Sequence, residues 1–320
     1  MQTAQDKVGW IGLGSLGFEM TQHLQKYLKS QSLPSLTVWN RTVEKAQKLA
    51  EIDPDVQIAS SVKELYSRSN IIFTSLANDH AVEEVYEILI HCAETAESQL
   101  IFVETGTIYP ELASSLQKRL SSLPQRHVYL QCPVFGPPQF AKAAKLLWVA
   151  SGDAVTIERL HPFFMSMSSR VLDLQTEDVR ASCTLKLIGN FMLMSQTEVL
   201  AESINLARKS NLDPKHVLSF VEEFLPAPAI VNNTRRTIDG EEAEEAVNMT
   251  LRIAAKDVGC LQKWGEANGA PMPTANLLKG HFQLAKEKGF TNWNFMIDTI
   301  NSAAEEEEHS WPNKRQKEEQ

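Results

Sequence analysis

The stretch KVGWIGLGSLG, residues 7–17, limits the possible folds more than any other part of the sequence. Apolar residues lead into Gly12, Gly14 and Gly17, and the segment FEMTQHLQKYLKS then spaces its apolar side chains at helical intervals. Strand, glycine turn and helix in this order begin a dinucleotide-binding βαβ unit. A glycine triplet alone is weak evidence, because glycine-rich strand-to-helix turns also occur without a ligand. Here both flanks are present, so we predict a dinucleotide site.

Each glycine has its own role in such a turn. Gly12 permits the tight bend, Gly14 lets the backbone approach a pyrophosphate, and Gly17 lets the helix pack on its strand. The first amides of the helix and its dipole then bind the phosphates. We therefore expect the cofactor to contact Gly12, Leu13, Gly14, Ser15, Leu16 and Gly17.

The end of the second expected strand indicates which dinucleotide binds. An NAD site usually has an acidic side chain about 20 residues beyond the turn, where it binds the ribose hydroxyls. This chain has Asn40 and Arg41 near that point instead. Arg41 can grip a 2′-phosphate with its planar guanidinium, Lys45 adds a second positive charge, and Thr42 offers a hydroxyl. These residues favour NADP, and a solvated basic turn is the alternative.

Further short apolar runs alternate with helical patterns to about residue 175. This alternation predicts an α/β Rossmann-type doubly wound sheet, and the close spacing of the last runs indicates antiparallel or mixed edge strands. After residue 178 the pattern is helical almost to residue 300, with proline-rich breaks at PAPAI and APMPT. We expect an NADP-binding domain at 1–177, an all-α helical substrate and dimerisation domain at 178–304, and a charged, disordered tail at 305–320.

Composition argues against several classes of function. Acidic residues outnumber basic ones by 40 to 31, and the net charge of -9 disfavours nucleic-acid and anionic-membrane surfaces. The apolar stretches are too short for a membrane span and MQTAQDK has no signal-peptide core, so we expect a cytoplasmic protein. The four cysteines form no C-x-x-C pair and the eight histidines have no ligand spacing, so no metal site is predicted.

Lys186 and Asn190 are the candidate catalytic residues. They are four residues apart in the long helical pattern, so their side chains share a face, and Gly189 leaves room beside them. A lysine that is partly desolvated can exchange a proton with an alcohol or carbonyl oxygen near neutral pH. By itself the pattern is also that of a solvated lysine on an amphipathic helix.

The motifs together resemble the β-hydroxyacid dehydrogenase family, which includes hydroxyisobutyrate dehydrogenases, glyoxylate/succinic semialdehyde reductases and phosphogluconate dehydrogenase. GLGSLGFEM, NRTVEK, VETGTIYP, CPVFG followed by ASGD, LKLIGN and AAKDV occur in the family's order. The resemblance covers residues 7–300, and its NRT-type segment implies NADP.

The resemblance implies a role for each matched residue. Lys186 would be the catalytic lysine, donating a proton while a carbonyl carbon of a small-molecule substrate is reduced by NADPH, and accepting it in the reverse reaction. Asn190 would position the substrate, and the helical domain would form a homodimer. The remaining cofactor contacts would come from Leu76, Ala77, Thr107 and Lys256.

The match fails at the substrate end of the site. The family usually has D-A-P-V-S-G-G, whose serine hydroxyl and glycine amides bind a substrate carboxylate, where this chain has QCPVFGP. Phe135 replaces the serine, Gly136 is kept, and Pro137 replaces the second glycine, so a hydroxyl and an amide donor are lost. Anion binding should therefore be weaker here.

Two further departures lie close to the same site. Arg180 and Ser182 stand where the family commonly has a G-x-G before the lysine, and Gly106 replaces the serine that usually precedes Thr107. The first change adds bulk where backbone usually approaches, and the second removes another hydroxyl.

Several hypotheses about the substrate and the function remain open from sequence. Either Arg180 anchors an anion and the substrate is a small carbonyl acid, or Phe135, Pro137 and Pro138 line a pocket for a larger, less polar carbonyl compound, which we favour. Phe135 could also point into the core. The rival functions are a non-catalytic NADP-binding regulatory protein and an imine reductase, although imine reductases usually lack a lysine corresponding to Lys186.

Overall fold

The computed structural model describes residues 5–239 and 251–289. The chain forms two compact units, Met1–Lys186 and Leu187–Gln320. The division falls inside a long helix, a few residues beyond the change of pattern that the sequence shows at 178. The tail predicted at 305–320 lies outside the described residues.

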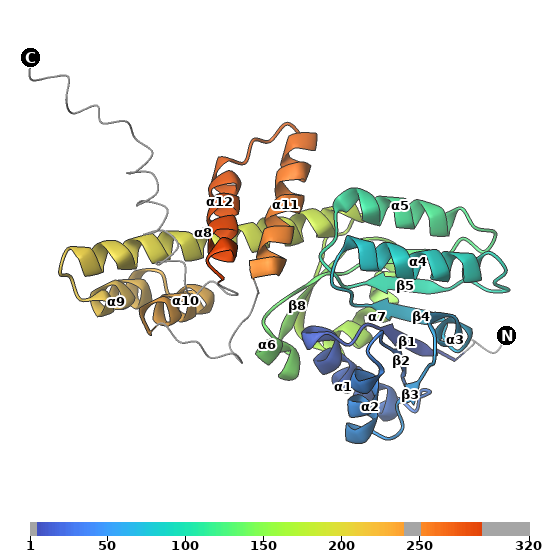
Figure 1. The fold of residues 1–320 in the computed structure, drawn as a ribbon. Coiled ribbons are helices and arrows are strands. Elements are labelled where there is room, and N and C mark those ends of the chain that lie inside the picture. The colour runs from blue at the N-terminus through green and yellow to red at the C-terminus, as the bar shows by residue number, and fades with distance from the viewer. Residues whose placement is uncertain (1–4, 240–250, 290–320) are drawn as a thin grey trace, which may run out of the picture. The chain divides into compact units, whose positions relative to one another are not determined.

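A parallel six-stranded sheet forms the centre of the first unit, in the order β3-β2-β1-β4-β5-β6. Its strands are β1 (Val8–Ile11), β2 (Thr37–Trp39), β3 (Gln57–Ile58), β4 (Ile71–Thr74), β5 (Ile101–Glu104) and β6 (Val128–Gln131). Every residue of β1, β4 and β5 is buried, as expected of parallel strands that are covered on both faces. The predicted Rossmann-type sheet is therefore confirmed (Figure 1).

Helices cover both faces of this sheet (Figure 1). One apolar core joins the strands to α1, α2 and α7, and a second joins them to α3, α4 and α5. The helices are α1 (Ser15–Ser30), α2 (Val43–Ile52), α3 (Val62–Ser67), α4 (Asp79–Ala93), α5 (Pro110–Ser121) and α7 (Ala154–Ser166).

The last strands of the first unit form a separate sheet, whereas the sequence indicated edge strands of the main one. This sheet has the order β7-β8-β9, antiparallel between β7 and β8 and parallel between β8 and β9. A single bridge, Gln131 to Ser151, links its margin to β6. Pro133 explains the break after β6, because proline has no amide hydrogen to continue a ladder. The elements are β7 (Val134–Phe135), α6 (Pro138–Lys142), β8 (Leu146–Ala150) and β9 (Ser168–Asp173).

The second unit is helical throughout its described residues. Prolines begin α9, α10 and α12 at the first helical turn, where a missing amide hydrogen costs nothing. α9 packs beside α10, and α11 beside α12 (Figure 1). Within the described ranges, no helix combines the length and the apolar character needed to span a bilayer. The helices are α8 (Arg180–Lys209), which starts in the first unit, α9 (Pro214–Phe224), α10 (Pro228–Asp239), α11 (Leu251–Ala267) and α12 (Pro273–Glu287).

Candidate active site

The strand order has its switch point at the carboxyl ends of β1 and β4. The chain adds β2 and β3 on one side of β1 and then returns to lay β4 on its other side, and ligands of open α/β sheets bind at such a switch point. The loops that follow β1, β2, β4 and β5 all leave from this edge, because the strands are parallel. These loops carry the glycine turn, the Asn40–Lys45 segment, Leu76–Ala77 and Thr107.

Two glycines of the turn are required by the fold itself. Gly12 has φ +98°, and a side chain there would overlap the carbonyl oxygen of Ser75. A side chain at Gly17 would overlap the carbonyl oxygen of Gly12, so this glycine allows α1 to start directly against the turn. The Trp10 indole donates a buried hydrogen bond of 2.9 Å to the same oxygen.

Gly14 differs from both because the space around it is open. It precedes α1, it is exposed, and no atom lies within 4 Å of the position that a Cβ would take. No side chain caps the start of α1 and no acidic residue lies in its first turn. Ser15 is exposed, whereas Leu13 and Leu16 pack into the core. The first amides of α1 are therefore free of side-chain caps and fit the pyrophosphate of a dinucleotide.

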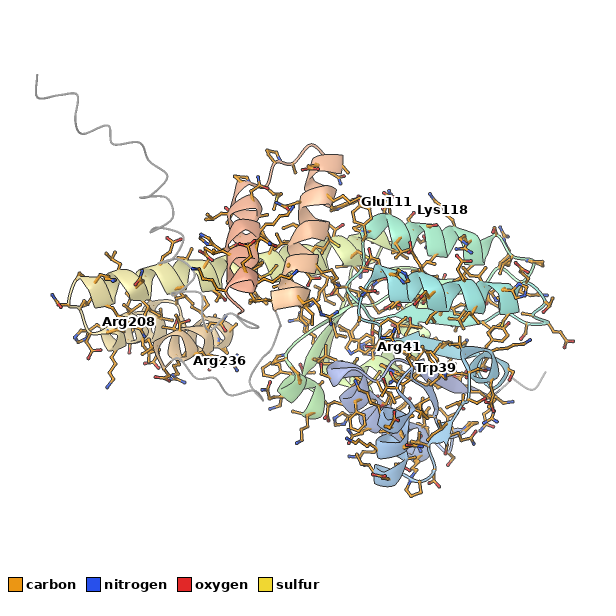
Figure 2. The ribbon with its side chains drawn as sticks, viewed as in Figure 1. Trp39, Arg41, Glu111, Lys118, Arg208 and Arg236 are labelled. Atoms are coloured by element: carbon orange, nitrogen blue, oxygen red, sulfur yellow. The ribbon has the colours of Figure 1, made fainter. Side chains whose placement is uncertain are left out.

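The segment after β2 has two parts: Asn40, which connects two loops by hydrogen bonds, and an exposed cationic surface. Asn40 accepts a hydrogen bond of 2.8 Å from the Leu13 amide and donates one of 2.8 Å to the Thr42 carbonyl, so it fixes the glycine turn to the start of α2. Arg41 and Lys45 are exposed, as is Thr42. Figure 2 shows Arg41 next to Trp39, at the end of β2. Neither cation has an ion-pair partner anywhere in 5–239 or 251–289.

Leu76, Ala77 and Thr107 lie at the same edge of the sheet. The Leu76 side chain comes within 3.2 Å of a Cβ built at Gly12, and its carbonyl oxygen within 3.3 Å of one built at Gly106. Leu76 therefore fills the space between the turns that follow β1 and β5. Ala77 is exposed and Thr107 is partly buried, which leaves both able to meet a ligand.

Glu104, which the sequence reasoning did not select, is a fully buried carboxylate beneath this edge. Its two oxygens accept hydrogen bonds of 2.6 Å, one from the Thr74 hydroxyl and one from the Gly106 amide. A Cβ at position 106 would lie 2.6 Å from the carboxylate, so a side chain there would require the carboxylate to move. An acidic residue that ends the apolar run QLIFVE was the available signal.

Lys186 contacts Phe135 within the first unit. Its ammonium nitrogen lies 4.0 Å from the centroid of the Phe135 ring, a cation–π arrangement. Both residues are partly exposed, and Phe135 ends β7 with its ring toward the lysine rather than in the core. Gly136 follows with φ +136°, a backbone conformation that favours glycine.

Arg180, considered above as an anion anchor, is bound to two carboxylates. Its Nε lies 2.9 Å from Asp178 Oδ1, its Nη2 donates a bond of 2.9 Å to Asp178 Oδ2, and its Nη1 lies 3.3 Å from Glu111 on α5. The hydrogen bonds from Arg180 hold the pKa of Asp178 below its usual value. The guanidinium is therefore already neutralised on three of its nitrogens.

The second unit places Asn190 and Lys256 around one buried carboxylate. The Asn190 amide donates a hydrogen bond of 2.6 Å to Asp257 Oδ2, and the Lys256 ammonium lies 3.2 Å from Oδ1. Asp257 is 1% exposed. Asp257 is not among the residues predicted from the sequence, although it follows Lys256 directly in AAKDV.

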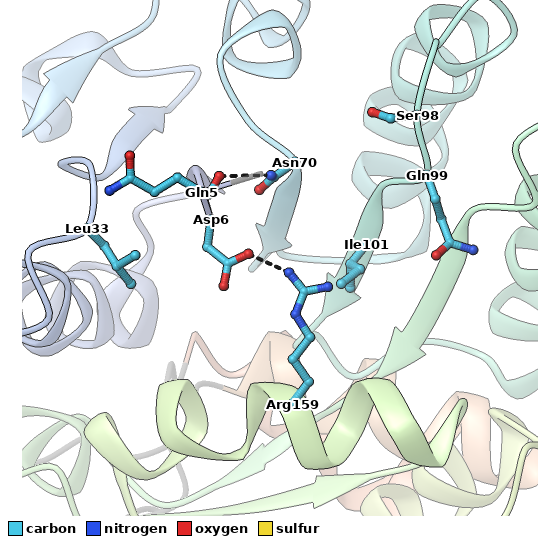
Figure 3. Close-up of a pocket in the computed structure, with 8 residues that line it drawn as sticks. All are labelled: Gln5, Asp6, Leu33, Asn70, Ser98, Gln99, Ile101 and Arg159. Atoms are coloured by element: carbon cyan, nitrogen blue, oxygen red, sulfur yellow. Dashed lines mark hydrogen bonds and ion pairs between the residues drawn. The ribbon is translucent and has the colours of Figure 1, made fainter. Parts of the chain in front are cut away.

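A hollow of about 750 Å³ lies at the opposite edge of the sheet (Figure 3). Its wall includes Asp6 before β1, Asn70 before β4 and Ile101 at the start of β5, all at the amino ends of parallel strands. Asp6 pairs with Arg159 across it, and Asn70 donates to the Gln5 carbonyl. It contains none of the predicted site residues.

Cysteines and metal-ligating groups form no second site in the part of the chain that the structure describes. The cysteines are free thiols, Cys132 and Cys183 are buried, and burial raises the pKa of the Cys132 thiol. Among these residues no group of three His, Cys, Asp or Glu side chains gathers in a way that could hold a metal ion.

Two family profiles match the chain. The NAD binding domain of 6-phosphogluconate dehydrogenase matches residues 7–177, and the NAD-binding domain of NADP-dependent 3-hydroxyisobutyrate dehydrogenase matches residues 181–297.

Individual proteins agree with this assignment. The chain is 26% identical to the NADH-dependent oxidoreductase ucdB of Aspergillus ustus over 85% of this chain and 90% of that one. It is 28% identical to an uncharacterized oxidoreductase, YfjR, of Bacillus subtilis over 92% and 99% of the two chains. The fold matches 3-hydroxyisobutyrate dehydrogenase of Mycobacterium tuberculosis, solved with L-serine, with a TM-score of 0.77, 20% identity and coverage of 92% and 99%. The chain therefore belongs to the β-hydroxyacid dehydrogenase family of pyridine-nucleotide-dependent oxidoreductases.

Proposed function

We propose that this chain is an NADP-dependent oxidoreductase that interconverts a carbonyl and a hydroxy compound, with Lys186 as general acid and base. The observation that carries the proposal is the position of Lys186, whose ammonium group lies 4.0 Å from the Phe135 ring in the unit that holds the glycine turn. Interconversion of an alcohol and a carbonyl needs one group that can give and take a proton, and lysine is such a group.

The cofactor preference rests on the segment after β2. Arg41 and Lys45 are exposed and have no carboxylate partner among the described residues, while Asn40 stands where an NAD site would carry an acid. Relatives use both cofactors: ucdB is named as NADH-dependent, and a structure of Psf3, with a TM-score of 0.75 and 22% identity, holds NADP+. In this chain the charges favour a 2′-phosphate.

The residues of this chain divide the chemistry among them. A bound NADPH supplies the hydride that reduces the carbonyl carbon. Lys186, as the ammonium ion, donates a proton to the carbonyl oxygen, and in the reverse direction the neutral amine removes the hydroxyl proton. Asp257 fixes the Asn190 amide through the bond of 2.6 Å, which orients it to position substrate. Thr107 and Lys256 would lie against the cofactor.

A rate assay tests the proposal. NADPH consumption is followed against aldehydes, keto acids, larger ketones and cyclic imines, with Lys186→Ala beside the wild type. Loss of a general acid should lower kcat by about 10²- to 10⁴-fold while NADPH affinity stays nearly unchanged. Lys209→Ala, at an exposed position on the same helix, is the matched control.

Other outcomes of this assay separate the rival functions. Lysine-independent turnover of imines would indicate an imine reductase. NADPH binding without turnover on the whole panel would favour a non-catalytic binding protein.

We also propose that the helical unit forms a homodimer. Four apolar side chains of α8, Ile188, Met192, Val199 and Leu206, are 42% to 69% exposed at intervals of four and seven residues, and so lie along one face. A second copy is the partner that fits an apolar stripe of this length. Light scattering should give a dimer mass for the wild type and a monomer mass for Met192→Lys. We also propose the cytoplasmic location that the sequence led us to expect.

A further inference from the structure

We infer that the substrate is an uncharged ketone or aldehyde whose apolar substituent packs against Phe135, and that carbonyl acids are disfavoured. The inference rests on the function proposed above and names its substrate class. Two observations carry it. The Phe135 ring lies beside Lys186, and the other polar side chains that could bind a substrate carboxylate already contact carboxylates of the protein.

The wall beside Lys186 offers apolar surface in place of hydrogen-bond donors. The Phe135 ring is partly exposed and covers one side of the ammonium group. Pro137 and Pro138 follow within three residues, and neither has an amide hydrogen. The aromatic face favours an alkyl or aryl substituent, since burying apolar surface is favourable by about 25 cal/mol per Å².

Lys186 cannot serve as the anchor of a substrate carboxylate and as the proton donor at the same time. In the proposed reaction its ammonium group must face the carbonyl oxygen, within hydrogen-bond reach. A carbonyl acid would therefore need a second cation or several amides to bind its carboxylate.

The other polar candidates already face carboxylates of the protein. In the first unit Arg180 is bound by Asp178 and Glu111. In the second unit Asp257 binds both Lys256 and the Asn190 amide. A substrate carboxylate would have to compete with these acidic groups and would be repelled by them. An uncharged carbonyl compound meets neither difficulty.

The test compares two ligands of one shape that differ in charge and that NADPH does not reduce, 3-phenylpropanamide and 3-phenylpropanoate. Calorimetry on the complex of the full chain with NADPH should give an affinity for the amide at least tenfold higher than for the carboxylate. In Phe135→Ser both ligands should lose the contact with the ring, but the new hydroxyl can donate a hydrogen bond to the carboxylate, so the amide should bind about tenfold more weakly and the preference should shrink toward equality. Phe224→Ser, which removes a phenylalanine of α9 that is 73% exposed, is the matched control and should leave the preference unchanged.

Equal or tighter binding of the carboxylate by the wild type would overturn the inference, and so would an unchanged preference in Phe135→Ser. The wild-type ratio decides the substrate class even if that variant does not fold. Failure of the proposed function would appear elsewhere, as the absence of Lys186-dependent turnover, and the binding comparison does not depend on turnover.

Discussion

Arg41 and Arg180 are both surface arginines of the first unit beside a predicted anion position, and their surroundings differ. Arg41 follows β2 with no carboxylate partner in the described part of the chain, whereas Arg180 is held by Asp178 and Glu111. Sequence alone presents both as anion anchors. A cation therefore marks an anion site only where no carboxylate of the protein already binds it.

The glycine turn and the segment 135–138 differ in the same way in their backbone. At the cofactor end, Gly14 and the uncapped start of α1 leave open space and free amides. At the substrate end, Pro137 and Pro138 remove amides, and the Phe135 ring takes up space. This difference supports the proposal that one end of the site binds a phosphate-bearing cofactor and the other an uncharged molecule.

The largest effect on this comparison should come from Arg41→Ala. A charge-assisted hydrogen bond is worth roughly 1.5–3 kcal/mol, so NADPH affinity should fall by about 10- to 100-fold while NADH affinity hardly changes. Fluorescence titration of both nucleotides measures this. Arg170→Ala, at another exposed arginine, is the control and should alter neither. Equal losses for the two nucleotides in Arg41→Ala would contradict the phosphate assignment.

Gly14→Ala should weaken NADPH and NADH alike, by about tenfold, or 1.4 kcal/mol. The new methyl group has open space in the free protein, so Tm should stay the same, but it would stand where the pyrophosphate approaches. Gly12→Ala and Gly17→Ala should instead lower Tm, because their side chains would overlap backbone oxygens. Unchanged nucleotide binding by Gly14→Ala would place the cofactor elsewhere.

The double variant Asp178→Asn, Glu111→Gln should leave Arg180, like Arg41, without a carboxylate partner. Asparagine keeps an acceptor for the Arg180 amide at the start of α8, so the helix should remain capped. The released guanidinium should improve 3-phenylpropanoate binding several-fold, since an exposed ion pair is worth about 0.2–1 kcal/mol. Affinity for the amide should not change. Calorimetry that finds no gain for the carboxylate would mean that Arg180 lies out of reach of the ligand.

The preference for the amide over the carboxylate should be the same at every pH from 6 to 8, because Asp178 stays charged throughout this range. Hydrogen bonding to Arg180 lowers the pKa of this carboxyl. The carboxylate therefore stays charged at every pH above the ordinary aspartate pKa of about 3.9. It loses its charge only as the pH falls through its own, still lower pKa. The ratio of amide to carboxylate affinity, measured across this range, should be flat. A fall in the ratio near pH 6 would show that another group controls access to Arg180.

Local sequence was enough to predict the parts of the structure that depend on neighbouring residues. The glycine turn, the alternation that gives the parallel sheet, and the proline-rich breaks where α10 and α12 begin are all local signals. The bond between Arg180 and Glu111 joins residues 69 positions apart, so no local pattern could reveal it. The same holds for Asn190 with Asp257. The separate β7-β8-β9 sheet depends on the break at Pro133, which the spacing of apolar runs does not register.

Transfer of the label from NADPH deuterated at the transferring position tests the central claim most directly. In a single turnover with a carbonyl substrate found in the rate assay, mass spectrometry of the product should find deuterium on the former carbonyl carbon for the wild type and for Lys209→Ala. Lys186→Ala should give almost none in the same time. Equal labelling by Lys186→Ala, or consumption of NADPH without deuterium at that carbon, would contradict the account.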